Sequence, residues 1–282
     1  MTPSVAPEPP GEGRIARAFA EARAHGRCCL IPYITAGDPD LARTRSIARG
    51  LAAAGADLLE IGVPFSDPIA DGPVNQRASE RALRNGVTMR TCLDLSARLR
   101  ADGAPPIILF TYYNPIHRMG LESFAVAAAS SGVDGVLVTD LPPEEADELQ
   151  AALRPRGVDL IFLLSPTSSK QRIERICRNA CGFIYVISRT GVTGAREDLP
   201  PGLEAQVRAA RDASRLPIAV GFGISRPEQA RRIADFADGV VVGSALVRLI
   251  EEHAGSAGLE ERVEEFCRTL QASLHLRPAA ES

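Results

Sequence analysis

The stretch DLLEIGVPFSDPIADGP, residues 57–73, has the form of a strand followed by a loop. Residues 58–62 are apolar apart from Glu60, and the residues after them are rich in proline, glycine and aspartate. Short, nearly continuous apolar runs are typical of strands that are covered on both faces, as in a parallel sheet. We therefore interpret this stretch as the start of one strand–helix unit.

The same unit recurs along the chain. The predicted strands are residues 29–34, 58–62, 107–111, 135–138, 160–164, 183–187, 218–220 and 239–242. Amphipathic helical patterns lie between them, for example at residues 41–54, 124–131, 144–153, 171–178, 203–213 and 227–236. Eight units with no visible linker favour an α/β fold with a single eight-stranded β/α (TIM) barrel over a doubly wound sheet.

Two helical patterns fall outside the repeating unit. Residues 15–24 predict an extra N-terminal helix that could plug the barrel, and residues 259–274 predict a C-terminal closing helix. The connection over residues 64–106 is long enough for one additional helix. Asp40 and Ser225 are the expected N-caps of the helices that follow them.

The domain prediction is one barrel over residues 13–276. Residues 1–12 and 277–282 are expected to be disordered tails. The N-terminal segment lacks the basic and apolar parts of a signal peptide, and the six cysteines are expected to be reduced thiols, so the predicted location is the cytoplasm.

Composition excludes two classes of partner. A formal net charge of −3 provides no broad basic surface for nucleic acid. No apolar run approaches the roughly 20 residues that a membrane-spanning helix needs. We therefore expect a small-molecule substrate, with no nucleic acid and no membrane as partner.

Glu60 is the first candidate for catalysis. If Leu59 and Ile61 point toward the surrounding helices, alternation directs Glu60 into the barrel mouth, where burial raises a carboxyl pKa toward values useful for proton transfer. A structural glutamate with satisfied hydrogen bonds is the alternative. Asp67 and Asp71 lie in the following loop, and spacing alone does not decide which of them faces a substrate.

Glycine-rich loops follow the last two strands. Gly221, Gly223 and Gly243 allow backbone amides to approach a ligand closely, and a short helix near Ser244 adds its positive end. Barrels of this class often bind phosphate after strands seven and eight, although plain tight turns would have the same composition. The loop that starts at Ser188 is expected to act as a lid.

Some mechanisms are disfavoured by residue type. A Schiff-base aldolase needs a lysine in the barrel mouth, and Lys170, the single lysine, lies beyond its strand end. The four histidines are scattered, which disfavours a metal-dependent aldolase. Carboxylate acid–base chemistry remains. All four tyrosines fall in or next to predicted strands, which an aromatic substrate or ordinary core packing would explain.

Residues 60–73 resemble the signature of the tryptophan synthase alpha subunit family, an indole-3-glycerol phosphate aldolase family. The resemblance continues at residues 33–39, 112–115, 140–142, 188–194 and 221–225, and it covers roughly residues 15–252. Asn75 departs from the pattern, since an aliphatic residue is usual before Gln76. We expect no catalytic consequence of that departure.

The resemblance implies retro-aldol cleavage of indole-3-glycerol phosphate into indole and D-glyceraldehyde 3-phosphate. Glu60 corresponds to the general acid–base, and Asp71 to the carboxylate that stabilises charge at the indole N–H. The implied substrate-binding residues are Tyr33, Tyr112, Leu137, Tyr185, Thr193, Gly194, Phe222, Gly223, Gly243 and Ser244. The implied partner-interface residues are Pro64, Phe65, Asp67, Pro68, Asn114 and Pro142.

The resemblance also implies a partner. The implied partner is a beta subunit, and the two chains form an alpha2–beta2 heterotetramer. Pyridoxal phosphate is expected only in the beta subunit. This chain is expected to need no cofactor and no metal. A free-standing lyase that releases indole would carry the same catalytic residues. A non-enzymatic activator of a beta subunit and another phosphate-binding barrel, such as an isomerase, leave the Glu60 and Asp71 motif unexplained.

Overall fold

The computed structural model describes residues 13–188, 199–221 and 223–275. Its eight strands are parallel and form a closed barrel in chain order, with β1 paired to β8. The strands are β1 (Cys29–Thr35), β2 (Leu59–Gly62), β3 (Ile107–Thr111), β4 (Gly135–Val138), β5 (Asp159–Leu164), β6 (Ile184–Ile187), β7 (Ile218–Gly221) and β8 (Gly239–Val242). The predicted barrel is confirmed, and each predicted strand end differs from the observed one by at most one residue.

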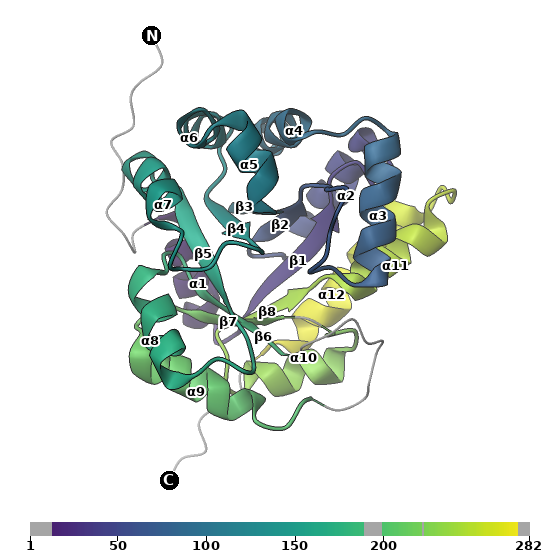
Figure 1. Ribbon diagram of the computed structural model, residues 1–282. Coiled ribbons are helices and arrows are strands. Elements are labelled where there is room, and N and C mark those ends of the chain that lie inside the picture. Colours follow the sequence, from purple (N-terminus) through teal and green to yellow (C-terminus); the bar gives the residue numbers. More distant parts are fainter. Residues whose placement is uncertain (1–12, 189–198, 222, 276–282) are drawn as a thin grey trace.

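Helices surround the barrel as an outer ring, apart from α1, which lies at one end of it (Figure 1). They are α1 (Arg14–Ala24), α2 (Leu41–Ala53), α3 (Pro73–Arg84), α4 (Met89–Ala101), α5 (Tyr113–Met119), α6 (Leu121–Ser130), α7 (Asp147–Leu153), α8 (Lys170–Asn179), α9 (Leu203–Ala213), α10 (Pro227–Ala234), α11 (Ser244–His253) and α12 (Leu259–Ser273). The additional helix expected between β2 and β3 is confirmed, because both α3 and α4 lie there. The sequence did not predict α5.

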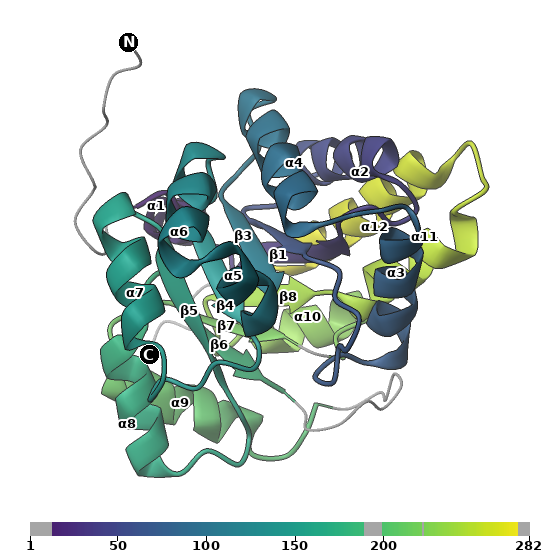
Figure 2. The ribbon, with the colours of Figure 1, turned by 45° about the horizontal axis from the view of Figure 1, so that its top comes forward.

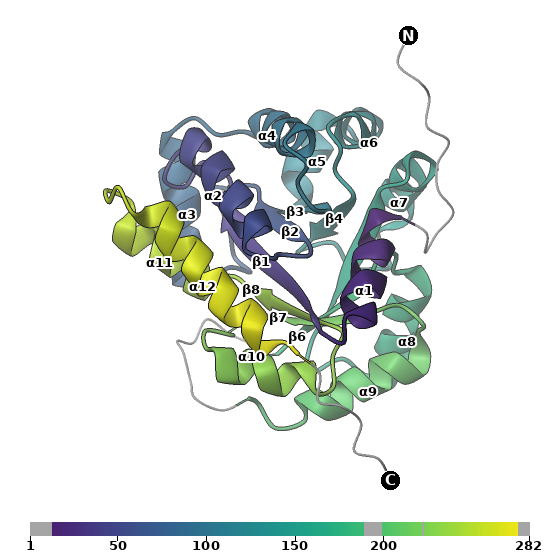
Figure 3. The ribbon, with the colours of Figure 1, turned by 180° about the vertical axis from the view of Figure 1, so that it is seen from behind.

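Helix α1 closes the end of the barrel at which the strands begin. Its buried residues Ile15, Ala18, Phe19 and Ala22 recur at helical spacing and pack among the inward side chains of the strands. The ring of Phe19 lies 5.5 Å from that of Phe183, between centroids, just before β6. Figure 3 shows α1 beside the start of β1, so the predicted plug is confirmed.

Strand side chains alternate between two apolar layers. Leu59 and Ile61 belong to the layer between strands and helices, whereas Tyr33 and Ile108 belong to the layer inside the barrel. In the sheet register Glu60 pairs with Tyr33 on one side and with Ile108 on the other. The expected inward direction of Glu60 follows from this arrangement.

Two strand-end glycines make room for tyrosine rings inside the barrel. A Cβ atom on Gly62 would lie 2.2 Å from the hydroxyl oxygen of Tyr33, and one on Gly221 would lie 2.2 Å from that of Tyr185. Because neither hydroxyl can overlap another atom, both positions require glycine for these two rings to occupy the barrel interior.

The two expected N-caps have different outcomes. Asp40 caps α2, since its side chain accepts a hydrogen bond of 2.8 Å from the backbone N–H of Arg43. Ser225 is not the N-cap of α10, because the helix begins at Pro227 and its N-cap is Arg226. The side chain of Gln229 reaches back and accepts from the backbone N–H of both Ser225 and Arg226, so the capping group comes from inside the helix.

The C-terminal helix closes the outer ring. α12 packs against α2, α10 and α11, and the carbonyl of Leu274 accepts a hydrogen bond from the backbone N–H of Cys28 at the start of β1. All six cysteines are free thiols, as expected. The tails at residues 1–12 and 277–282 lie outside the described residues. No helix in the described part of the chain combines the length and apolarity that crossing a membrane requires.

The plug gives a stability test. Replacing Phe19 by Ala removes a buried ring at the floor of the barrel, and we expect a loss of about 3 kcal/mol in the free energy of unfolding. Urea denaturation followed by circular dichroism measures it. Phe266→Ala, at a half-buried position on α12, is the matched control and should cost less. An equal cost for the two variants would contradict the plug interpretation.

Candidate active site

The polar residues singled out in the sequence gather at the end of the barrel where the strands finish. The loops after β2, β3 and β4 are joined there by hydrogen bonds. Thr139 donates its backbone N–H to the carbonyl of Thr111, and the backbone N–H of Tyr113 donates to the Asp140 carboxylate at 2.7 Å. In barrels of this kind the strand ends and the loops after them carry the chemistry.

Glu60 lies on β2 inside the barrel and is 1% exposed. Burial, and secondly the negative charge of Asp71, raise the pKa of Glu60 to about 8. Its Oε1 atom is buried and has no hydrogen-bond partner. A purely structural glutamate would have its oxygens paired, so this arrangement favours a proton-transfer group over the structural alternative. At neutral pH the carboxyl group is protonated.

Asp71 is the second buried acid at this end, with 5% exposure. Burial raises its pKa to about 6, while side-chain hydrogen bonds with Tyr112 and Asn75 lower it. Asp67 is exposed, and its carboxylate accepts a hydrogen bond from the Ser66 hydroxyl at 2.6 Å. Burial thus separates the two acids, because Asp71, and not Asp67, shares the electrostatic environment of Glu60. Which of them faces a substrate stays a prediction.

Tyr112 holds the loop between β2 and α3 in place. Its hydroxyl donates to Oδ2 of Asp71 at 3.0 Å and accepts from the backbone N–H of Ala70 at 3.0 Å. Its ring stacks on Phe65, with centroids 5.0 Å apart. Tyr112 therefore contacts the loop at three points, and its expected contact with a substrate stays a prediction.

The other expected aromatic contacts also lie in the barrel interior. Tyr33, Leu137 and Tyr185 are all buried in the inner apolar layer. Burial raises the pKa of both tyrosines well above the ordinary value, and the charge of Glu60 raises both further. Both hydroxyls thus stay protonated, and the two tyrosine rings and Leu137 all belong to the apolar layer inside the barrel.

The expected phosphate-binding residues are described in part. α11 begins at Ser244 directly after Gly243, so the helix N-terminus predicted there is present. Gly223 has a φ of +82°, a backbone conformation that favours glycine. A Cβ on Gly243 would lie 3.5 Å from Cβ of Tyr33, so the start of α11 lies next to Tyr33. Thr193, Gly194 and Phe222 lie outside the described residues, as does most of the expected lid.

Five of the six expected interface residues lie in the loops after β2 and β4, the sixth, Asn114, lies on α5, and they differ in exposure. Asp67 and Asn114 are exposed, Phe65, Pro68 and Pro142 are half-buried, and Pro64 is buried. Sequence reasoning missed Ile69, which is 85% exposed between the two aspartates. A large aliphatic residue between Asp67 and Asp71, in a loop that also carries two prolines and a glycine, is the signal that could have identified it.

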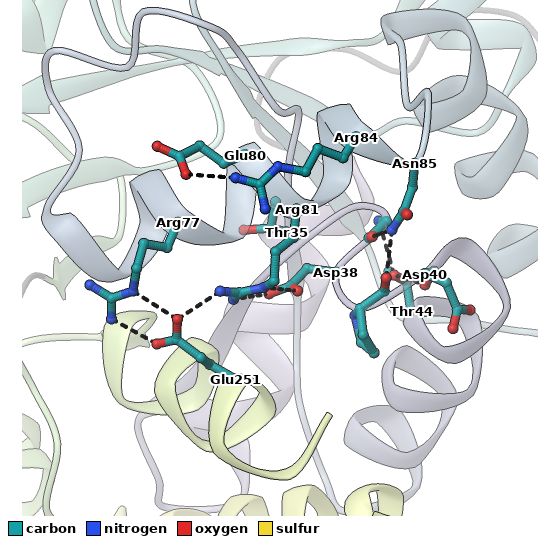
Figure 4. Close-up of polar contacts among 12 residues, drawn as sticks. Thr35, Asp38, Asp40, Thr44, Arg77, Glu80, Arg81, Arg84, Asn85 and Glu251 are labelled. Carbon is teal, nitrogen blue, oxygen red and sulfur yellow. Dashed lines mark hydrogen bonds and ion pairs between the residues drawn. The ribbon is translucent and has the colours of Figure 1, made fainter. Parts of the chain in front are cut away.

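An ion-pair network anchors α3 beside α11 (Figure 4). Arg81 on α3 donates two hydrogen bonds, of 2.8 and 2.9 Å, to Asp38, which is 2% exposed in the loop after β1. Arg81 also donates to Glu251 on α11, and Arg77 donates to both carboxylate oxygens of Glu251 at 2.7 Å. Figures 1 and 2 show α3 and α11 side by side. The network therefore connects the helix that follows Asp71 with the helix that begins at Ser244.

Comparison with known proteins gives consistent matches. A family model described as tryptophan synthase alpha chain matches residues 19–275. A protein named tryptophan synthase alpha chain from Geobacter sulfurreducens is 51% identical over 261 residues, which is 93% of this chain and 98% of that relative.

Solved structures agree with this result. Tryptophan synthase subunit alpha from Legionella pneumophila has a TM-score of 0.85 and 38% identity, covering 93% of this chain and 98% of that one. A chain of Mycobacterium tuberculosis tryptophan synthase has a TM-score of 0.87 and 36% identity, covering 94% of this chain and 99% of that one.

The network predicts a pH-dependent contribution to stability. Hydrogen bonds from Arg77 and then Arg81 lower the pKa of Glu251 to about 2. A depressed pKa stabilises the folded state above the ordinary glutamate pKa, and this stabilisation is lost as the pH falls toward 2. Glu251→Gln should cost about 1–2 kcal/mol at pH 7, and the difference from wild type should shrink between pH 5 and pH 3 in urea denaturation.

The control for this experiment is Glu80→Gln, because Glu80 pairs with Arg84 at 3.5 Å on the exposed side of α3. That variant should stay within about 0.5 kcal/mol of wild type at every pH. A Glu251→Gln difference that is independent of pH would contradict the assigned role of the ionised carboxylate.

Proposed function

The chain belongs to the tryptophan synthase alpha chain family, and on that premise we propose that Glu60 and Asp71 cleave indole-3-glycerol phosphate by acid–base chemistry. The family is one of lyases in tryptophan biosynthesis. The products are indole and D-glyceraldehyde 3-phosphate. The observation that supports these roles most directly is that two buried carboxyl groups with different pKa values, about 8 and about 6, lie at one barrel end.

Glu60 acts first as the acid in this proposal. It is protonated at neutral pH and gives its proton to the ring carbon that bears the side chain, which makes the ring an acceptor for electrons. Asp71 is ionised at neutral pH and stabilises the positive charge that develops at the ring N–H. The two groups therefore have the complementary protonation states that the first step needs.

Bond cleavage then follows with Glu60 as the base. Its carboxylate takes the proton of the hydroxyl group next to the ring, and the electrons of that O–H bond form the aldehyde carbonyl. The carbon–carbon bond breaks, and its electron pair returns to the ring to restore aromatic indole. Glu60 ends protonated, as it began, so the step needs no cofactor and no metal in this chain.

Substrate binding is assigned to the remaining expected residues. Tyr33, Leu137 and Tyr185 are proposed to enclose the indole ring, with Tyr112 next to Asp71. The phosphate is proposed to bind the backbone around Gly223, Gly243 and Ser244, where the start of α11 favours an anion. Binding a group remote from the breaking bond supplies energy for orienting the substrate.

The partner and location also belong to the proposal. We assign the three joined loops to contact with a beta subunit in an alpha2–beta2 heterotetramer. The proposed location is the cytoplasm. The beta subunit, which depends on pyridoxal phosphate, takes up the indole. Ile69, exposed in the middle of the loop that carries Asp71, supports this assignment because a large aliphatic side chain loses contact with water when a partner covers it.

Indole release from indole-3-glycerol phosphate tests the activity. We expect slow release by the isolated chain, a sharp rise on adding a beta subunit, and a loss of at least about 10²-fold in Glu60→Gln. The profile of kcat/KM against pH should be bell-shaped, with an acid limb near 6 from Asp71 and a basic limb near 8 from Glu60. The ionised form of Asp71 and the protonated form of Glu60 coexist only between these values.

Other outcomes have defined meanings. Fast release by the isolated chain that a beta subunit does not change would support a free-standing lyase. No release under either condition would contradict the enzymatic proposal and leave a binding role.

The partner contact is tested by Ile69→Ser. We expect affinity for the beta subunit to fall roughly tenfold, because about 1–2 kcal/mol of apolar burial is lost, while the melting temperature of the isolated chain stays unchanged. Isothermal titration calorimetry measures the affinity. Val126→Ser on α6 is the matched control and should bind as wild type does, because among the described residues Val126 is the second exposed large aliphatic side chain (46% exposed). Equal affinity of the two variants would place the interface elsewhere.

A further inference from the structure

Residues 68–71 form a tight turn in the loop between β2 and α3. The backbone N–H of Asp71 donates to the carbonyl of Pro68 at 3.0 Å, which closes the turn. The turn buries Asp71 and leaves Ile69 exposed. A turn of this kind has one internal hydrogen bond, so contacts from outside decide how firmly it is held.

Tyr112 contacts the turn from the end of β3. Its hydroxyl accepts a hydrogen bond of 3.0 Å from the backbone N–H of Ala70 and donates one of 3.0 Å to the carboxylate of Asp71. These bonds hold one amide and the acid group of the turn. They do not involve the carbonyl groups of its backbone.

Gln76 contacts those carbonyl groups from the first turn of α3. Its Nε2 atom donates to the backbone carbonyl of Asp71 at 2.9 Å and lies 3.5 Å from the carbonyl oxygen of Pro68. Because both oxygens only accept, the NH2 end of the side-chain amide must face them. One side chain thus contacts the carbonyl groups of the first and the last residue of the turn.

The three polar groups of Asp71 therefore each have a partner. Its backbone N–H bonds to Pro68, its backbone carbonyl to Gln76, and its carboxylate to Tyr112. The bond from Gln76 acts on the peptide group of Asp71, and the orientation of the backbone sets the direction in which the side chain leaves the turn. A misplacement of about 1 Å at a reacting group can cost roughly 10²-fold in rate.

We propose that Gln76 is a positioning residue, which fixes the backbone of the turn at residues 68–71 and thereby directs the Asp71 carboxylate. The effect on catalysis rests on the proposed function. The effect on the turn concerns the substrate-free chain and does not depend on any reaction. The two effects therefore need separate measurements.

The first measurement is hydrogen exchange at the amides of Ala70 and Asp71 in the substrate-free chain, by mass spectrometry of peptides that contain residues 69–72. In Gln76→Leu we expect exchange at both amides to be roughly tenfold faster, because the turn opens more often when the bond from α3 is lost. Gln76→Glu, of nearly equal shape, should also exchange faster, because an ionised carboxylate cannot donate to a carbonyl. Unchanged exchange in both variants would overturn the proposal.

The second measurement is the cleavage reaction. In Gln76→Leu we expect kcat at pH 7 to fall roughly tenfold while KM stays within about twofold of wild type, because a misdirected carboxylate weakens an interaction that matters most in the transition state. A raised KM with an unchanged kcat would contradict the positioning of Asp71.

Gln150→Leu on α7 is the matched control. The half-buried Gln150 side chain donates to the carbonyl of Asn179 at 2.6 Å, where α8 ends before β6 begins, so it makes the same kind of bond at the other end of the barrel. This variant should lower the melting temperature and leave kcat and the exchange of Ala70 and Asp71 unchanged. An equal fall of kcat in the two leucine variants would overturn the proposal.

The two measurements separate this proposal from the proposed function. If wild type does not cleave the substrate while Gln76→Leu still accelerates exchange at Asp71, the proposed function fails and the role of Gln76 in holding the turn stands.

Discussion

The protonation of Glu60 depends on its burial inside a closed sheet. The side chains around it are apolar or aromatic, and desolvation therefore favours the neutral acid at a pH where a solvent-exposed glutamate would be ionised. The nearby charge of Asp71 acts in the same direction. Closure of the barrel by α1 at one end and the tyrosine rings inside it maintain that environment, so the floor of the barrel contributes to the acidity of a group at the other end.

The loop between β2 and α3 carries a buried acid and an exposed apolar side chain close together. Asp71 is buried, and hydrogen bonds from the Tyr112 hydroxyl and from the Gln76 amide on the first turn of α3 fix its position. Ile69, two residues earlier, faces outward and is almost fully exposed. Only Ala70 separates them, so one short loop carries both an outward apolar side chain and a buried acid.

The two ends of the site are connected by the helices that carry them. Helix α3 follows Asp71, and helix α11 starts at the glycine-rich turn after β8. Arg81 on α3 donates hydrogen bonds both to Glu251 on α11 and to Asp38 in the loop after β1. Two arginines around Glu251 keep this carboxylate ionised at all but very acidic pH. The ion-pair network outside the barrel therefore links α3 to α11 in addition to the strand pairing inside it.

The sequence by itself determined the barrel, the ends of its strands and the inward direction of Glu60. These features follow from apolar runs, from alternation along strands and from the spacing of apolar residues along helices. All three are local patterns that can be read directly from the sequence. Spacing did not separate the burial of Asp71 from that of Asp67, and it did not locate the capping group of α10 inside the helix at Gln229. Tertiary structure decided these points, because burial and hydrogen-bond partners such as Tyr112 depend on residues far apart in the chain that meet only when the barrel closes.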